Sequence, residues 1–246
     1  MAASRIQHVE VAQIAASNAV ANISTPTSGN LLLAWMSGDS VFTPRPTGFT
    51  QIYAALNNND FWVGYKVATG AETNVTFTYN GSGSGGLVGG VMEYSGLDTT
   101  TVPEGGLIGI GATHAYNAGY AASGAQITPS VQVTYGATDL LVGIAVLGAL
   151  IAAPSAPVWT TGTPLNGNNF ASPGTGGITG NDQYAFLADN TAAPAGNPTI
   201  DCTWTGNTAA TRTLMLIAFT LGGPSSVTGR RAIVAPSRAA IQASYY

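Results

Sequence analysis

The stretch Thr76-Phe77-Thr78-Tyr79-Asn80-Gly81 recurs about 125 residues later, with residues of similar type in the same order, as Asp201-Cys202-Thr203-Trp204-Thr205-Gly206. Both stretches alternate polar and apolar residues and end in glycine, which is the pattern of a strand with one buried face. The apolar runs that follow, Gly89–Tyr94 and Leu214–Phe219, match at the same offset. Repetition over this distance indicates a duplicated, sheet-forming scaffold.

Upstream of these strands the two halves still match, but the offset falls to about 110 residues. The second half therefore contains an insertion, which we place at residues 160–182. We expect pseudo-repeats over about residues 6–98 and 125–222, joined by a long connection over residues 99–124. The matching upstream pairs are Ile23–Pro26 with Ile127–Pro129, Asn30–Leu32 with Asp139–Leu141, and Thr43-Pro44 and Phe49 with Ala153-Pro154 and Trp159.

Strand signals dominate the chain, and no segment shows a sustained period of 3.6 residues. Most of the expected strands are rich in β-branched and aromatic residues and are bounded by Gly, Pro, Asn or Ser. Leu140–Leu147 is apolar on both faces, as expected of a central strand covered on each side. The expected strands are 6–14, 20–24, 31–36, 61–67, 74–79 and 87–94 in the first half, and 126–135, 140–147, 184–188, 199–204 and 213–221 in the second.

The composition predicts a folded protein with an unusually uncharged surface. Only 7% of the 246 residues are charged, whereas 45% are hydrophobic and 32 are glycine. Enough apolar residues are present to bury a core, so the composition does not indicate disorder. A surface of hydroxyls and amides with a net charge of −4 gives little repulsion between molecules, which favours a protein that works within an assembly.

The charge is divided between an acidic body and a basic C-terminal arm at residues 225–246. Arg230, Arg231 and Arg238 lie in the last 18 residues, which contain no acid, while residues 1–229 hold four basic and eleven acidic residues. Such an arm would bind a neighbouring copy of the protein or nucleic acid. Three arginines are few for phosphate binding, so nucleic acid is the weaker interpretation. Residues 237–244 are expected to form a short helix.

Other features exclude several classes of protein. Cys202 is the single cysteine, so no intrachain disulfide is possible, and its place in a strand predicts a small buried side chain rather than a nucleophile. The N-terminus lacks the pattern of a signal peptide. The apolar run Leu140–Ala153 is too short for a membrane-spanning helix. We expect a protein made in a cytoplasm, with no membrane partner.

The segments Gly29–Leu32, Tyr65–Ala68 and Val91–Asp98, with a degenerate second copy that begins at Asp139, carry a resemblance to known proteins. Through them the chain resembles jelly-roll or lectin-like β-sandwich modules, which occur in tailed-bacteriophage virion proteins and in some bacterial surface proteins. The match extends over roughly residues 6–222 and omits the arm. It implies an all-β, jelly-roll-type β-sandwich (residues 1–224) and a structural or adhesive role in a virion. It brings no catalytic residue.

Motifs that suggest chemistry have simpler structural explanations. Gly81–Gly86 fits a dinucleotide fingerprint, but a strand follows it where a helix would be needed. Glu93 has no second carboxylate two or four residues away, so it is expected to be a hydrogen-bonded structural residue rather than a glycosidase acid. His8 and His114 lack ligands at metal spacing. Asn57–Asp60 and Asn181-Asp182 offer too few acids for calcium and are expected to be turns.

Tyrosines outside the expected strands are the best candidates for contacts, because tyrosine has an apolar body and a polar tip. The sequence predicts a bacteriophage head decoration or cement protein that binds the major capsid protein and copies of itself, with no catalytic residue, metal or cofactor. The alternatives are a tail or baseplate component and a glycan-binding module; a hydrolase acting through Glu93 is weaker. The candidate assembly contacts are Arg230, Arg231, Arg238, Tyr245 and Tyr246, and the candidate loop contacts are Tyr116, Tyr120, Asn168, Asn169 and Phe170.

Overall fold

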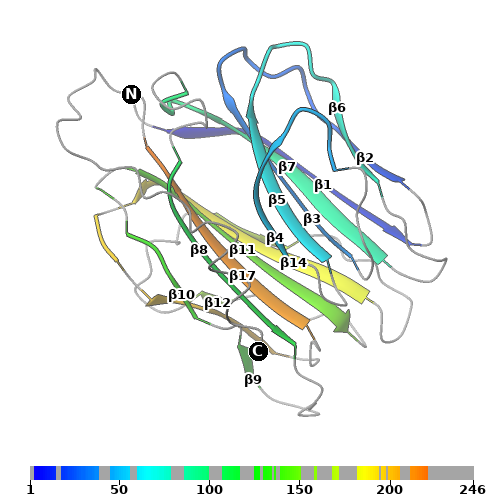
Figure 1. The fold of residues 1–246 in the computed structure, drawn as a ribbon, viewed down its shortest axis with the longest axis vertical. Coiled ribbons are helices and arrows are strands. Elements are labelled where there is room, and N and C mark those ends of the chain that lie inside the picture. Colours follow the sequence, from blue (N-terminus) through cyan, green and yellow to red (C-terminus); the bar gives the residue numbers. More distant parts are fainter. Residues whose placement is uncertain are drawn as a thin grey trace, which may run out of the picture.

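A computed structural model shows an all-β protein (Figure 1). Its described part contains no helix that is both long and apolar enough to cross a membrane. It describes residues 3–14, 18–38, 45–55, 60–78, 86–99, 107–116, 125–127, 130–134, 136, 139–150, 158–159, 168–171, 182–193, 195–197, 199–205 and 211–220.

Two five-stranded antiparallel sheets form the centre of the molecule. The first has the order β1-β7-β3-β5-β4 and the second the order β8-β17-β11-β14-β13. The strands of the first sheet are β1 (Ser4–Ile14), β3 (Leu31–Gly38), β4 (Thr50–Ala55), β5 (Asp60–Val67) and β7 (Gly86–Ser95). Those of the second are β8 (Leu107–Tyr116), β11 (Asp139–Leu150), β13 (Asn168–Ala171), β14 (Asp182–Ala193) and β17 (Thr211–Phe219).

The two sheets have the same strand order when their strands are matched in chain order. The equivalent strands are β1 and β8, β3 and β11, β4 and β13, β5 and β14, and β7 and β17. Equivalent residues follow from the pairing: Leu31 lies opposite Tyr94, and Leu140 lies opposite Phe219. Each half of the chain therefore builds a sheet with the same connectivity.

The main core lies between these two sheets, which pack face to face as in a β-sandwich (Figure 1). Alternate residues of β3 point into it, among them Leu33 and Trp35, and Val142 and Ile144 of β11 do the same from the other side. All four side chains are fully buried. This alternation is what the period of two residues in a strand dictates.

Smaller sheets cover the outer faces of both large ones, so the molecule has four layers (Figure 1). Over the first sheet lie β2 (Asn18–Asn22) and β6 (Asn74–Thr78), whose inward residues Val75 and Phe77 join a second core with Trp62. Over the second sheet lie β9 (Ala125–Ile127), β10 (Val131–Gln132), β12 (Val158–Trp159), β15 (Thr199–Ile200) and β16 (Cys202–Thr205).

The all-β prediction is confirmed, and β11 is apolar on both faces because one face packs on the first sheet and the other on the small outer sheets. The expected strand over 126–135 is divided into β9 and β10. The predictions of long loops are wrong in two places. The connection 99–124 contains the ten-residue strand β8, and the insertion 160–182 contains β13. Both are Gly-, Ala- or Asn-rich edge strands held by backbone pairing, so their side chains gave a weak strand signal.

Gly90 of β7 lies against the largest side chain of the main core. A Cβ atom at this position would lie 2.8 Å from the indole Nε1 of Trp35 and 3.0 Å from the carbonyl oxygen of Val9. Trp35 and the neighbouring strand β1 therefore occupy the volume that any side chain at position 90 would need.

We expect Gly90→Ala to lower the free energy of unfolding by about 1–3 kcal/mol, because the methyl group overpacks a filled core. The control is Asn18→Ala on the exposed face of β2, which should change it by less than about 0.5 kcal/mol. Urea unfolding of the three proteins measures both values. Equal stability of the two variants would contradict this packing.

Candidate functional site

The structure places four predicted contact residues in strands rather than in loops. Tyr116 is the last residue of β8 and pairs with Thr211, while Asn168, Asn169 and Phe170 belong to β13 and pair with β14. The prediction that they lie in loops is wrong, because each belongs to an edge strand whose backbone completes the second sheet. Whether they contact a partner stays a prediction.

The other predicted contacts lie outside the described residues. They are Tyr120, Arg230, Arg231, Arg238, Tyr245 and Tyr246, and the expected helix over 237–244 lies there too.

A charged cluster joins the two large sheets, and the sequence did not predict it. Asp189 of β14 is fully buried, and its Oδ2 accepts hydrogen bonds from Arg5 Nη1 at 2.8 Å and from the Tyr94 hydroxyl at 2.8 Å. Arg5 lies on β1 and Tyr94 on β7, so both donors belong to the first sheet. Burial, followed by the negative charge of Asp189, raises the pKa of Tyr94 well above its ordinary value, so Tyr94 stays a neutral donor.

A second polar pair crosses the same interface. The hydroxyl Oγ of Ser37 on β3 donates a hydrogen bond to Oε1 of Gln183 on β14 at 3.4 Å, and both residues are buried. Polar pairs inside an apolar interface fix the register of one sheet on the other, because any shift would leave buried polar groups without partners.

The Arg5–Asp189 pair gives a double-mutant prediction. Arg5→Met and Asp189→Leu should each lower the free energy of unfolding by about 3 kcal/mol, since each leaves a buried charge or hydroxyl without its partner. The double variant should lose clearly less than the sum of the two, because it removes both charges together. Simple additivity of the two losses would show that the pair does not couple the sheets.

Glu93 is a buried carboxylate with three hydrogen-bond donors around it. Its Oε1 accepts from Asn30 Nδ2 at 2.5 Å and from the backbone N–H of Thr27 at 3.0 Å, and its Oε2 accepts from Gln7 Nε2 at 2.6 Å. Gln7 also forms two hydrogen bonds with the backbone of Ser24. Glu93 thus ties β1 and the segment between β2 and β3 onto β7, which is a structural arrangement.

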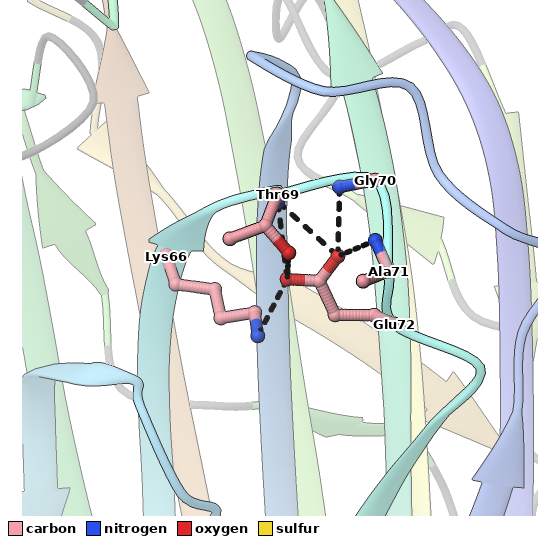
Figure 2. Close-up of polar contacts among 5 residues, drawn as sticks. All are labelled: Lys66, Thr69, Gly70, Ala71 and Glu72. Atoms are coloured by element: carbon pink, nitrogen blue, oxygen red, sulfur yellow. Dashed lines mark hydrogen bonds and ion pairs between the residues drawn. The ribbon is translucent and has the colours of Figure 1, made fainter.

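Glu72 closes the turn between β5 and β6 (Figure 2). Its carboxylate accepts hydrogen bonds from the backbone N–H groups of Thr69, Gly70 and Ala71 and forms an ion pair with Lys66 at 2.8 Å. Desolvation would raise the pKa of Glu72, but the hydrogen bond from Lys66 and those from the backbone outweigh it and lower the pKa from 4.5 to about 2. Gly70 has a φ of 85°, which favours glycine in this turn.

This lowered pKa makes the turn sensitive to acid. Because the folded pKa lies below the unfolded one, the carboxylate stabilises the fold fully above pH 4.5, and the contribution is lost as the pH falls toward 2. Glu72→Gln should therefore lower the free energy of unfolding by about 1 kcal/mol at pH 7. The difference from wild type should disappear near pH 2. A difference that is the same at both pH values, measured by urea unfolding, would contradict the assignment.

The remaining reactive side chains also have structural surroundings. Cys202 is buried, and desolvation followed by the nearby Asp201 raises the pKa of its thiol, so the prediction of a buried, unreactive cysteine is consistent with its environment. His8 lies 3.3 Å from Glu10, measured from Nε2 to Oε1. Within the described part of the chain no three His, Cys, Asp or Glu residues form a group that could hold a metal ion.

Comparison with known proteins adds no family or relative: no family model, curated protein or solved structure matches this chain. In the described part of the chain three carboxylates, those of Asp139, Asp189 and Glu93, are buried and accept hydrogen bonds from the same chain, and a fourth, that of Glu72, closes a turn.

Proposed function

We propose that this protein is a structural component of a tailed-bacteriophage virion and that it binds the outside of the head as a decoration or cement protein. The observation that carries the proposal is the four-layered body, in which both faces of each large sheet are covered and the buried carboxylates bind other parts of the same chain. Such a body resists deformation and is suited to transmitting load between subunits.

Charge and composition support the same proposal. The charged side chains at Arg5, Lys66, Glu72, Glu93 and Asp189 are engaged in contacts within the chain. With only 7% charged residues, the surface is left to hydroxyls, amides and backbone. On a capsid, many modest contacts of this kind add up, because each copy is held by several neighbours at once.

The resemblance described above also favours a virion protein, and the basic arm, with Arg230, Arg231 and Arg238, would tie each copy to an acidic neighbour. Within this proposal the partners are the major capsid protein and copies of the same chain. The jelly-roll type of sandwich is part of the proposal as well, and the equivalent connectivity of the two packed sheets supports it.

Virions assembled with and without this protein test the proposal. We expect on the order of hundreds of copies on each head and rupture at a lower temperature, or after a milder osmotic shock, when the protein is missing. The control is a virion from which a tail protein has been removed, whose heads should rupture as in wild type. About a dozen copies confined to the tail, with unchanged head stability, would contradict a decoration role and favour a tail component.

A further inference from the structure

The equivalent edge strands β1 and β8 differ in the residues that they carry at matching positions. β1 pairs with β7 as β8 pairs with β17, and both pairs have a register shift at the same place. In this common register, His8 and Glu10 of β1 correspond to Ile110 and Ala112 of β8. The first half therefore has two ionisable residues where the second half has apolar ones. Such a departure from a shared scaffold indicates a specific contact at these positions.

His8 and Glu10 lie on the face of β1 that turns toward the main core. Ala12, two residues further along the same face, packs against that core. The side chain of His8 is 18% exposed and that of Glu10 is 13% exposed. Nε2 of His8 and Oε1 of Glu10 are both buried atoms and lie 3.3 Å apart. Two polar side chains are thus enclosed side by side at the margin of an apolar core.

The indole of Trp35 extends toward the same place from β3. Gly90 of β7 lies between the two strands, opposite Glu10 on one side and opposite Trp35 on the other. Residues opposite each other in neighbouring strands project on the same face of a sheet. Nε1 of Trp35 lies over Gly90, 2.8 Å from the position that a Cβ atom would take there. Because Gly90 has no side chain, the indole N–H can extend across β7 toward Glu10.

A buried donor and a buried acceptor at this place lack a hydrogen-bond partner. Trp35 is fully buried, and in the described part of the chain no atom accepts a hydrogen bond from its Nε1. Oε1 of Glu10 likewise accepts none from that part. Buried polar groups in native proteins are nearly all paired, through ordered water where no protein group serves. A donor and an acceptor on either side of Gly90 therefore suit a small molecule that accepts from one and donates to the other.

We propose that Trp35, Glu10 and His8 form a binding site for one water molecule inside the main core. The water accepts a hydrogen bond from the indole N–H of Trp35, donates one to Oε1 of Glu10, and contacts Nε2 of His8. About three polar partners are usual for a buried water. The water links β3 to β1 across β7 and so holds the edge strand on its sheet. The site is not repeated in the second half, where Ile144 takes the position of Trp35.

A high-resolution crystal structure of the full chain tests the site directly. We expect one ordered water at hydrogen-bonding distance, about 2.7–3.2 Å, from both Trp35 Nε1 and Glu10 Oε1. The internal control is the equivalent place in the second half, beside Ile144 and Met215, where no water should lie. A direct hydrogen bond from the indole N–H to Glu10, or no electron density for water between the two groups, would overturn the proposal.

Nuclear magnetic resonance gives a second test in solution, on the full chain with isotope-labelled tryptophan. The indole N–H signal of Trp35, identified by its loss in Trp35→Phe, should show a direct dipolar cross-peak to a long-lived water. Glu10→Gln keeps an acceptor oxygen and should keep this cross-peak, whereas Glu10→Met, which has a similar size but no such acceptor, should lose it. The proposal is wrong if the wild-type chain shows no cross-peak or if Glu10→Met retains it in full. These outcomes are independent of whether the protein is found on virions.

Discussion

Both large sheets are apolar on both faces, and the rest of the structure depends on covering all four of those faces. The central strands β3 and β11 show the constraint most clearly, because alternate residues of each enter different cores and every side chain described in them is buried. Packing the two sheets on each other covers one face of each. The outer faces are covered by the small sheets, and the strands of each small sheet come from the same half of the chain as the large sheet that they cover.

The two halves keep the same connectivity but have diverged at the residues that hold the molecule together. Glu93 lies opposite Leu32, whereas the equivalent residue in the second half is Ala218, opposite Leu141. Asp189 lies opposite Val142, and its equivalent in the first half is Tyr65, opposite Leu33. The polar contacts are therefore not repeated. One anchors β1 within the first half, and the other joins the two halves across their interface.

Residue patterns predicted the features that depend on local alternation and on long apolar runs. Phe77 was placed on a buried face by alternation, and β11 was identified as a covered strand because it is apolar on both faces. Edge strands such as β8 and β13 were missed, because backbone pairing with a neighbour, rather than side-chain pattern, makes them strands. The match of Ile23 with Ile127 was also displaced, since the pairing register makes Asn18 the equivalent of Ile127.

The charged cluster of Arg5, Tyr94 and Asp189 could not be predicted from the sequence, for a different reason. Arg5 and Asp189 are separated by 184 positions, and no local pattern says that one aspartate of β14 points into an apolar interface toward another sheet. Only the packing of the two sheets brings this carboxylate to Arg5 and Tyr94. Sequence periodicity shows which residues are buried in a strand, but the partner of a buried charge is set by the tertiary arrangement.

The shared apolar interface joins the two halves, and we expect it to make them one cooperative body. Differential scanning calorimetry of the whole chain measures this cooperativity. We expect a single transition whose calorimetric enthalpy equals its van't Hoff enthalpy, as for a two-state unit. Two separate transitions, or a calorimetric enthalpy about twice the van't Hoff value, would show instead that the halves unfold independently.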